Sequence, residues 1–260
     1  MHPSTKRTAT VGGFVAGGSG GVGSVMYGGL REPGNVLGAR VVTVEAEPRV
    51  IVLDAEAAQK INRAYGTTGI ITQLDMPLAP AWPWIDVAIV FDDFMQSVRV
   101  GHEIALADGI IKKLVTVFAA PLPTYFGALG KLCPPGKSLM ICMIAEPFMN
   151  CFRDLLGKRG EIVLEEPFDE SPSHTPIYEH AWNHTTLQVL KVDRGVTYLQ
   201  CLYPADTLIE SVELMTTTFA EEQMQHLEFI RFGGKLTASS IPVLRYKDAD
   251  RLYELSLIHI

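Results

Sequence analysis

Runs of apolar residues separated by turn residues predict the elements of the N-terminal third of the chain. Residues 35–44 read as a buried strand, residues 48–53 as its hairpin partner and residues 55–64 as a short helix. Residues 65–74 predict a further strand. The proline-rich stretch that follows marks a boundary near Ala81, because proline interrupts both helices and central strands.

Beyond this boundary the predicted elements alternate between strands and helices. Apolar runs predict strands over residues 85–91, 110–118, 138–145 and 161–165. Helical spacing predicts helices over residues 94–107, 125–132 and 148–159. Asp92 or Asp93 is expected to cap the first of these helices. This order favours an α+β sandwich of ferredoxin-like type with an antiparallel sheet. Farther along, residues 226–234 and 235–246 predict a hairpin joined at a glycine pair.

Composition and charge limit the function classes. The chain has 260 residues, of which 47% are hydrophobic and 20% are charged, as expected of a soluble globular protein. A net charge of −7 argues against nucleic acid or an anionic membrane surface as the main partner. We find no signal peptide and no apolar run long enough to span a membrane, so we expect a cytoplasmic protein. The four cysteines show no C-x-x-C spacing, which predicts reduced thiols and no metal site.

A glycine-rich segment near the N-terminus raises the question of nucleotide binding. Residues 12–24, GGFVAGGSGGVGS, contain G-x-G-x-x-G at Gly18, Gly20 and Gly23. A Rossmann turn needs a strand before it, for which residues 8–16 are a weak candidate, and a helix starting inside it. The glycines and the proline that follow oppose such a helix. We therefore expect a long loop between two β segments, suited either to cradle an anionic ligand or to form a corner without one.

Three motifs in order carry a family resemblance. They are TVGGFVAGGSGGVGS from residue 10, YGGLREPGNVLGARVVT from residue 27 and YGTTGIITQLDMPLAP from residue 65. Together they resemble the second half of the FAD-binding domain of the vanillyl-alcohol-oxidase/PCMH-type family, the FAD-linked oxidases and dehydrogenases. The match covers residues 8–80 and fades afterwards.

The resemblance implies a fold, a cofactor and a set of binding residues. It implies the C-terminal part of a PCMH-type FAD-binding domain at residues 1–81, followed by a ferredoxin-like α+β cap domain at residues 82–254 that holds the substrate. FAD is the implied cofactor, with the glycine loop beside its pyrophosphate and flavin ring and the closing strand beside its adenosine half. The cofactor-binding residues carried over are Val11, Gly12, Gly13, Gly17, Gly18, Gly20, Gly21, Gly69 and Ile70.

Two departures lead us to expect a fragment. The first pyrophosphate loop of the family, P-x-G-G-G-T-like with its own βαβ unit, is absent from the sequence, and Tyr65 stands where the family has an acidic residue. At the other end, residues 255–260 spell LSLIHI, which matches the translation of a sequencing adapter. We expect these six residues to be an artefact; the alternative is an ordinary apolar C-terminal strand.

Candidate chemistry gathers in a polar and aromatic cluster at residues 178–186. His180 and His184 are spaced four apart, so on one helix they could share a face and bind a metal or transfer a proton. Without a third ligand, a metal site is not expected. Oxidation of a hydroxy acid needs a base for the hydroxyl proton, for which either histidine is a candidate, and a cation for the carboxylate, for which Arg194 is a candidate.

Two further residues qualify the choice of substrate. Family members that oxidise 2-hydroxy acids often carry W-x-x-R-K in this region, whereas Trp182 is followed here by N-H-T-T. Arg231 alternates with apolar neighbours in a predicted strand. It could meet a substrate carboxylate, but a structural ion pair is the favoured interpretation.

The sequence therefore predicts a fragment of an FAD-dependent oxidoreductase. The expected reaction is hydride transfer from a small alcohol or 2-hydroxy acid to the flavin. The first alternative is a non-catalytic α+β module that binds a small molecule or an anion with the glycine loop. A third reading is an unfolded fragment with exposed strand edges.

Overall fold

The structure is a computed structural model that describes residues 1–18, 20–220 and 222–258. Ser19 of the glycine segment and residues 259–260 of the LSLIHI hexapeptide lie outside the described residues. The α-helices are α1 Val11–Gly17, α2 Ser24–Tyr27, α3 Ala55–Ala58, α4 Phe94–Leu106, α5 Gly127–Gly130, α6 Met149–Leu156, α7 His184–Leu190, α8 Leu208–Thr218 and α9 Ala249–Ile258. The 3-10 turns are η1 Leu122–Tyr125, η2 Glu146–Phe148, η3 Ile177–His180 and η4 Ala205–Thr207.

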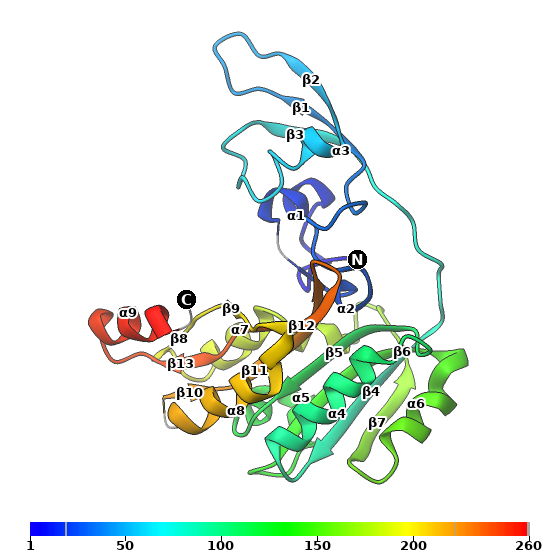
Figure 1. Ribbon diagram of the computed structural model, residues 1–260, viewed down its shortest axis with the longest axis vertical. Coiled ribbons are helices and arrows are strands. Elements are labelled where there is room, and N and C mark those ends of the chain that lie inside the picture. The colour runs from blue at the N-terminus through cyan, green and yellow to red at the C-terminus, as the bar shows by residue number, and fades with distance from the viewer. Residues whose placement is uncertain (19, 221, 259–260) are drawn as a thin grey trace.

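The strands form one small, one large and one minor sheet (Figure 1). The small sheet has the order β2-β1-β3, from β1 Gly38–Val42, β2 Val50–Asp54 and β3 Ile70–Asp75. The large sheet has the order β7-β4-β6-β5-β11-β12-β9, from β4 Trp84–Phe91, β5 Lys112–Phe118, β6 Ser138–Ala145, β7 Glu161–Pro167, β9 Cys201–Leu202, β11 His226–Phe232 and β12 Lys235–Ser240. The minor sheet has the order β10-β13-β8, from β8 Val196–Tyr198, β10 Gln223–Met224 and β13 Val243–Arg245.

The small sheet confirms the strands predicted in the N-terminal third. β1 pairs antiparallel with both β2 and β3, so that Val41 lies opposite Ile51 on one side and Ile71 on the other. α1 packs against this sheet, and Val15 joins Val41 in the same buried cluster. The helix predicted over residues 55–64 is shorter, since α3 covers only its first turn.

The glycine segment corrects the expectation of a strand over residues 8–16 and of a loop between two β segments. Its first half, through Gly17, is helical, because Thr10 and Gly18 supply the caps that a helix needs. The Thr10 side chain accepts a hydrogen bond from the Gly13 N–H at 3.0 Å, and Gly18 ends α1 with φ 57°. Phe14 is buried and contributes the apolar face. The segment after Gly23 forms only the single turn of α2.

The large sheet confirms the ferredoxin-like arrangement. The four strands β7-β4-β6-β5 are antiparallel, and α4 and α6 connect them as a β-α-β-β-α-β unit. Asp93 rather than Asp92 caps α4, since its side chain accepts the Gln96 N–H at 2.7 Å. β11 then extends the sheet beyond β5. The predicted hairpin is correct through β12, but its last residues leave the sheet and form β13.

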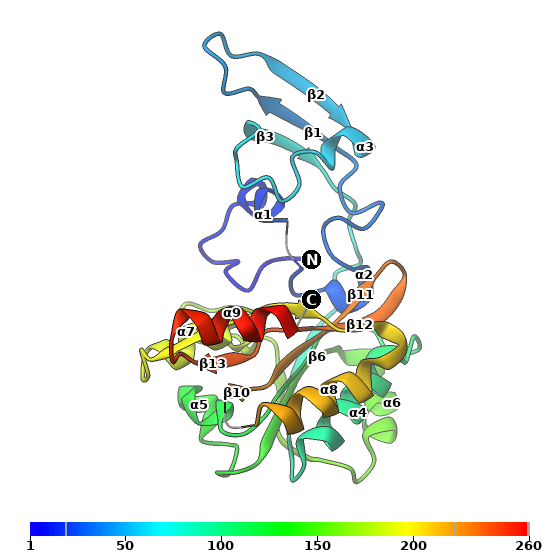
Figure 2. The ribbon, with the colours of Figure 1, turned by 60° about the vertical axis from the view of Figure 1, so that its left-hand side comes forward.

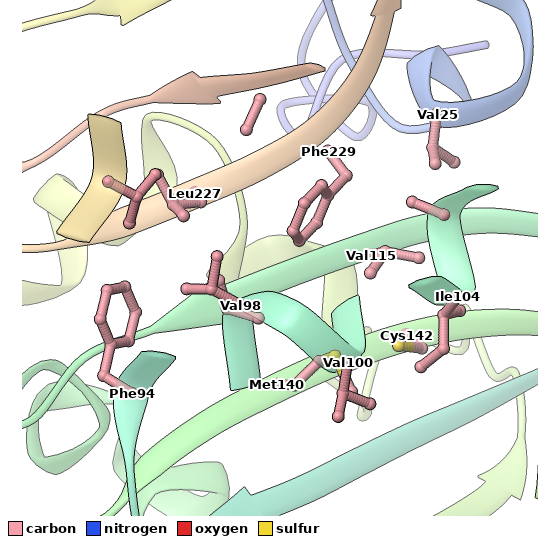
Figure 3. Close-up of a cluster of buried hydrophobic side chains, with 14 of the residues drawn as sticks. Val25, Phe94, Val98, Val100, Ile104, Val115, Met140, Cys142, Leu227 and Phe229 are labelled. Carbon is pink, nitrogen blue, oxygen red and sulfur yellow. The ribbon is translucent and has the colours of Figure 1, made fainter. Parts of the chain in front are cut away.

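Both faces of the large sheet are buried, which explains why its central strands are apolar at nearly every position. One face carries α4, α6 and α8, as Figure 1 shows, and Figure 3 shows side chains of α4 such as Val98 and Ile104 packed against Val115 and Phe229 of the strands. The other face is covered by irregular segments and short helices, with Tyr178 fully buried among them.

The N-terminal segment connects the small sheet to the large one. In Figures 1 and 2 it lies between them, whereas the extended residues 76–83 run along the side. The Gly23 N–H donates to the Lys113 carbonyl of β5 at 2.7 Å, and Val25 of α2 enters the helix-side core. The expected domain boundary at residue 81 stays a prediction.

The C-terminal residues form a helix rather than a strand. α9 runs through Ile258, so the alternative of an apolar C-terminal strand is wrong for the described part of LSLIHI. Leu255 is buried in the helix-side core. The expectation that the hexapeptide is an adapter artefact stays a prediction.

Candidate functional site

A cavity of about 700 Å³ lies between the glycine segment and the far edge of the large sheet. Gly17, Gly18 and Gly20 line it on one side, and Ile230 of β11 and Ser239 of β12 line it on the other. This volume falls within the range of small-molecule and cofactor sites. The N-terminal segment thus forms a site jointly with the large sheet.

Backbone strain concentrates in the walls of this cavity. Among the described residues, the non-glycine residues with positive φ are Arg63 at 61°, Tyr65 at 52° and Trp182 at 55°. All three line the cavity. A bulky residue in this conformation costs free energy, and such residues cluster at ligand sites. The strain therefore marks the cavity as the candidate functional site, independently of the glycine motif.

Two backbone hydrogen bonds hold the strained turn at Arg63 and Tyr65. The Arg63 N–H donates to the Val15 carbonyl at 3.1 Å, and the Tyr65 N–H donates to the Ala16 carbonyl at 2.9 Å. Both acceptors belong to the last turn of α1, whose carbonyls lack partners inside the helix. The turn therefore satisfies the end of α1 and places both side chains at the cavity.

A buried hydrogen-bond network holds Trp182. The Glu228 carboxylate of β11 accepts hydrogen bonds from the Trp182 N–H and from the Thr116 hydroxyl of β5. It also lies 2.8 Å from Nε2 of His226, which is fully buried. This network was not predicted from the sequence. The available signal was the polar residues that interrupt an otherwise apolar strand, HLEFIRF.

Several glycines of the motif allow close packing against neighbouring residues, and some of them also line the cavity. A Cβ on Gly18 would collide with Arg63, and a Cβ on Gly20 would collide with the Trp182 ring. A Cβ on Gly21 would collide with the His2 carbonyl. Gly17 has open space at its Cβ position. Three of the nine predicted cofactor residues thus line the cavity, and two of those three are also required by their neighbours.

The remaining predicted cofactor residues are not among those that line the cavity. They lie in helix α1, at the start of strand β3, or next to the β-bridge between His2 and Val22. These residues are Val11, Gly12, Gly13, Gly21, Gly69 and Ile70. Gly12 contacts Ile71, while Val11 and Ile70 are exposed. Gly69 has φ 149° and packs closely against Val41, and a Cβ at this position would collide with the Val41 side chain. Their assignment to FAD stays a prediction.

The two candidate histidines do not share a helix face. His180 ends η3, whereas His184 begins α7, with Trp182 at positive φ between them. Burial lowers the pKa of His180 to about 4 and also lowers the pKa of His184, so both rings are neutral near pH 7. His180 packs against Phe126 inside the core.

His184 and Arg194 lie outside the cavity wall itself. His184 is half-buried and directly follows the cavity residues Trp182 and Asn183. Arg194 is exposed in the turn between α7 and β8. Arg231, by contrast, forms an ion pair with Asp108, in agreement with the favoured structural interpretation.

The described part of the chain contains neither a cluster of metal ligands nor a membrane-spanning helix. No three His, Cys, Asp or Glu side chains in the described ranges converge as ligands of a metal ion would. No described helix has the length and apolar character needed to cross a membrane. The four cysteines, all described, are free thiols.

Comparison with known proteins bears on the fold. No family model and no curated protein matches the chain. Solved structures do match: two crystal forms of alkyldihydroxyacetonephosphate synthase align with TM-scores of 0.67 and 0.63, each at 15% sequence identity. Each alignment covers 99% of this chain and 53% of the synthase chain. The chain therefore spans about half the length of these structures.

The chain shares its fold with about half of the synthase chain. The α+β fold class predicted from the sequence is confirmed. At 15% identity the likeness is one of fold, so it assigns neither a reaction nor a substrate to this chain.

Proposed function

We propose that this chain is part of an FAD-dependent oxidoreductase and that FAD binds in the cavity between the glycine segment and the large sheet. The observation that carries the proposal is the convergence of Gly17, Gly18 and Gly20 with strained Arg63 and Trp182 on one cavity. The fold match supports the same cofactor.

The residues present fit a large, anionic and aromatic ligand. Gly17 has open space at its Cβ position, so a ligand can approach the backbone closely there. Tyr65, Trp182, Tyr198 and Phe232 provide aromatic walls. The indole Nε1 of Trp182 is buried and has no hydrogen-bond partner within the described residues. These features match the flavin and phosphate portions of FAD.

The proposed reaction is oxidation of a small alcohol or a 2-hydroxy acid. Bound FAD would supply the two-electron redox chemistry. His184 is the proposed base that takes the substrate hydroxyl proton, because it is neutral near pH 7 and directly follows the cavity residue Asn183. His180 is the second choice, since it lies in the core. Arg194 is the proposed partner of a substrate carboxylate.

The test of cofactor binding uses two glycine variants. Gly17→Leu places a side chain in the cavity, and Gly109→Leu is the matched control, because its Cβ position is equally open but lies away from the cavity. We expect purified protein to bind FAD with a flavin absorbance band, and Gly17→Leu to weaken the affinity about tenfold or more. If both variants bind FAD with equal affinity, FAD does not bind in this cavity.

The test of the reaction follows from the first. A panel of small alcohols and 2-hydroxy acids is added anaerobically to FAD-loaded protein, and loss of the flavin band reports oxidation. We expect His184→Ala to slow this loss and His180→Ala to have the smaller effect. If the parent binds FAD but no panel member bleaches it, the oxidation reaction is wrong while FAD binding stands.

A second candidate is a non-catalytic module that binds an anion. Two cavity arginines without ion-pair partners within the described chain, Arg31 and Arg63, favour an anionic ligand of any kind. The similar solved structures are named as a synthase of a phosphate-bearing product, which also agrees with an anion in the cavity. A parent protein that binds pyrophosphate without binding any flavin would support this module over the flavoenzyme.

A further inference from the structure

Two arginines face the same cavity with no partner of their own. Arg31 and Arg63 both line the cavity, and neither side chain makes a hydrogen bond or an ion pair within the described chain. Glu32 also lines the cavity and contributes one negative charge, with its Oε1 accepting the Gly233 N–H of the β11–β12 turn at 2.8 Å, so the two arginines leave the lining with an excess of positive charge. Two unpaired guanidinium groups therefore give this concave surface a positive potential in a chain of net charge −7.

The positions of the two arginines are coupled through the core. Each follows a buried residue, Leu30 and Asn62 respectively, and the Asn62 Nδ2 donates to the Leu30 carbonyl at 3.0 Å. This buried hydrogen bond joins the Asn62 side chain to the Leu30 backbone, so the two arginines follow residues that are in contact although 32 positions apart in the sequence. The two side chains thus leave the core from adjacent points.

The conformation of Arg63 indicates a role beyond solubility. At φ 61° an arginine is strained where glycine would be free, and an arginine needed only for solubility has no reason to occupy this position. The strain places the guanidinium on the cavity wall, next to the glycine turn that packs against its Cβ. Arginine offers a planar fork of donors that matches phosphate oxygens.

We propose that Arg31 and Arg63 form an anion subsite that binds a phosphate group of the cavity ligand. The inference deepens the proposed function and rests on it, because it takes the same cavity as the ligand site. The phosphate comes either from the pyrophosphate of FAD or from a phosphate-bearing substrate, and both present the same oxygen chemistry to the two guanidinium groups.

The experiment measures dissociation constants for FAD, for riboflavin and for inorganic pyrophosphate by titration calorimetry. The variants are Arg31→Ala, Arg63→Gly and Arg63→Lys. Arg63→Gly removes the guanidinium while relieving the strain, so it is expected to melt no lower than the parent. The matched control is Arg40→Ala, which removes an exposed arginine of β1 that lies outside the cavity and has no side-chain partner among the described residues.

The expected result is a phosphate-specific loss. Arg31→Ala and Arg63→Gly weaken FAD about tenfold each and leave riboflavin unchanged, while Arg63→Lys is intermediate and Arg40→Ala behaves as the parent. If the phosphate belongs to a substrate, FAD affinity is unchanged, and the variants instead lose pyrophosphate binding to the FAD-loaded protein.

The remaining outcomes separate this inference from the proposed function. If FAD and pyrophosphate bind equally well to the parent and to both arginine variants, the subsite is refuted while FAD binding stands. If the parent binds pyrophosphate in an arginine-dependent way but binds no flavin, the subsite stands and the flavin function fails. A parent that binds none of the three probes overturns both.

Discussion

The burial of the Asp86 carboxyl group predicts an unusual dependence of stability on pH. It lies on β4 with only 1% of its surface exposed, and neither carboxylate oxygen has a hydrogen-bond partner within the described residues. Burial raises the pKa of Asp86 to about 7; the negative charge of Glu166 adds to this rise and the positive charge of Lys113 opposes it. The carboxyl group is therefore protonated in the folded protein at a pH at which it is ionised in the unfolded chain.

The magnitude follows from the difference between the two pKa values. Below pH 4 the carboxyl group of Asp86 is protonated in both states, so its titration contributes nothing to the free energy of unfolding. Between pH 4 and 7 the folded state binds the extra proton, so stability falls as pH rises, by about 1.4 kcal/mol per pH unit. Above pH 7 the destabilisation reaches its full value of roughly 4 kcal/mol.

The assay compares the parent with Asp86→Asn by guanidinium unfolding from pH 5 to pH 8. Asparagine keeps the shape of the side chain and removes its titration. The free energy of unfolding of the variant, taken relative to that of the parent, should therefore increase by about 2–3 kcal/mol between pH 5 and pH 8. His2 and His180, whose pKa values burial lowers, titrate equally in both proteins and cancel in the difference. Asp75→Asn is the control, because Asp75 is exposed.

One result would refute this reasoning. If the stability difference between Asp86→Asn and the parent is the same at pH 5 and at pH 8, the carboxyl group does not titrate between its unfolded and folded values. The site would then be hydrated or paired in solution.

Three further predictions concern single contacts. Glu228→Ala leaves the hydrogen-bond donors of its network unpaired in the core, so we expect the free energy of unfolding to fall by about 3 kcal/mol and the fluorescence of Trp182 to change. Unchanged emission would contradict the role of Glu228 in positioning Trp182. Gly20→Ala forces the Trp182 ring aside, so both the melting temperature and FAD affinity should fall, and an unchanged melting temperature would argue against the close packing. Asp93→Ala removes the cap of α4 and should cost about 1 kcal/mol in the same unfolding assay, whereas Asp92→Ala should cost less.

The elements that the sequence predicts correctly are those whose structure depends on neighbours along the chain. The apolar runs of β4 and β6 and the capped helix α4 follow from local periodicity and local hydrogen bonds, so the ferredoxin-like order of the large sheet was predictable. The small sheet followed in the same way from its strand and turn signals. These elements need only their own residues to specify their type.

Helix α1 shows the limit of that local reasoning. Its glycines read as a loop, because their low helix propensity was weighed without the cap at Thr10 and without the surface that buries Phe14. The preference of glycine for irregular structure is worth about 1 kcal/mol per residue, and packing against the small sheet exceeds it.

The candidate site depended on tertiary structure almost entirely. The glycine segment was recognisable in the sequence, but only the fold places Gly20 against Trp182, and only the fold holds Trp182 through Glu228. The strain at Arg63 likewise arises because the end of α1 binds that turn. Contacts between residues far apart in the sequence leave no periodic signal, because each depends on where two separate elements meet. The sequence alone therefore determined the strands of the small sheet, the ferredoxin-like part of the large sheet and the candidate cofactor, and the tertiary structure decided which residues share a cavity.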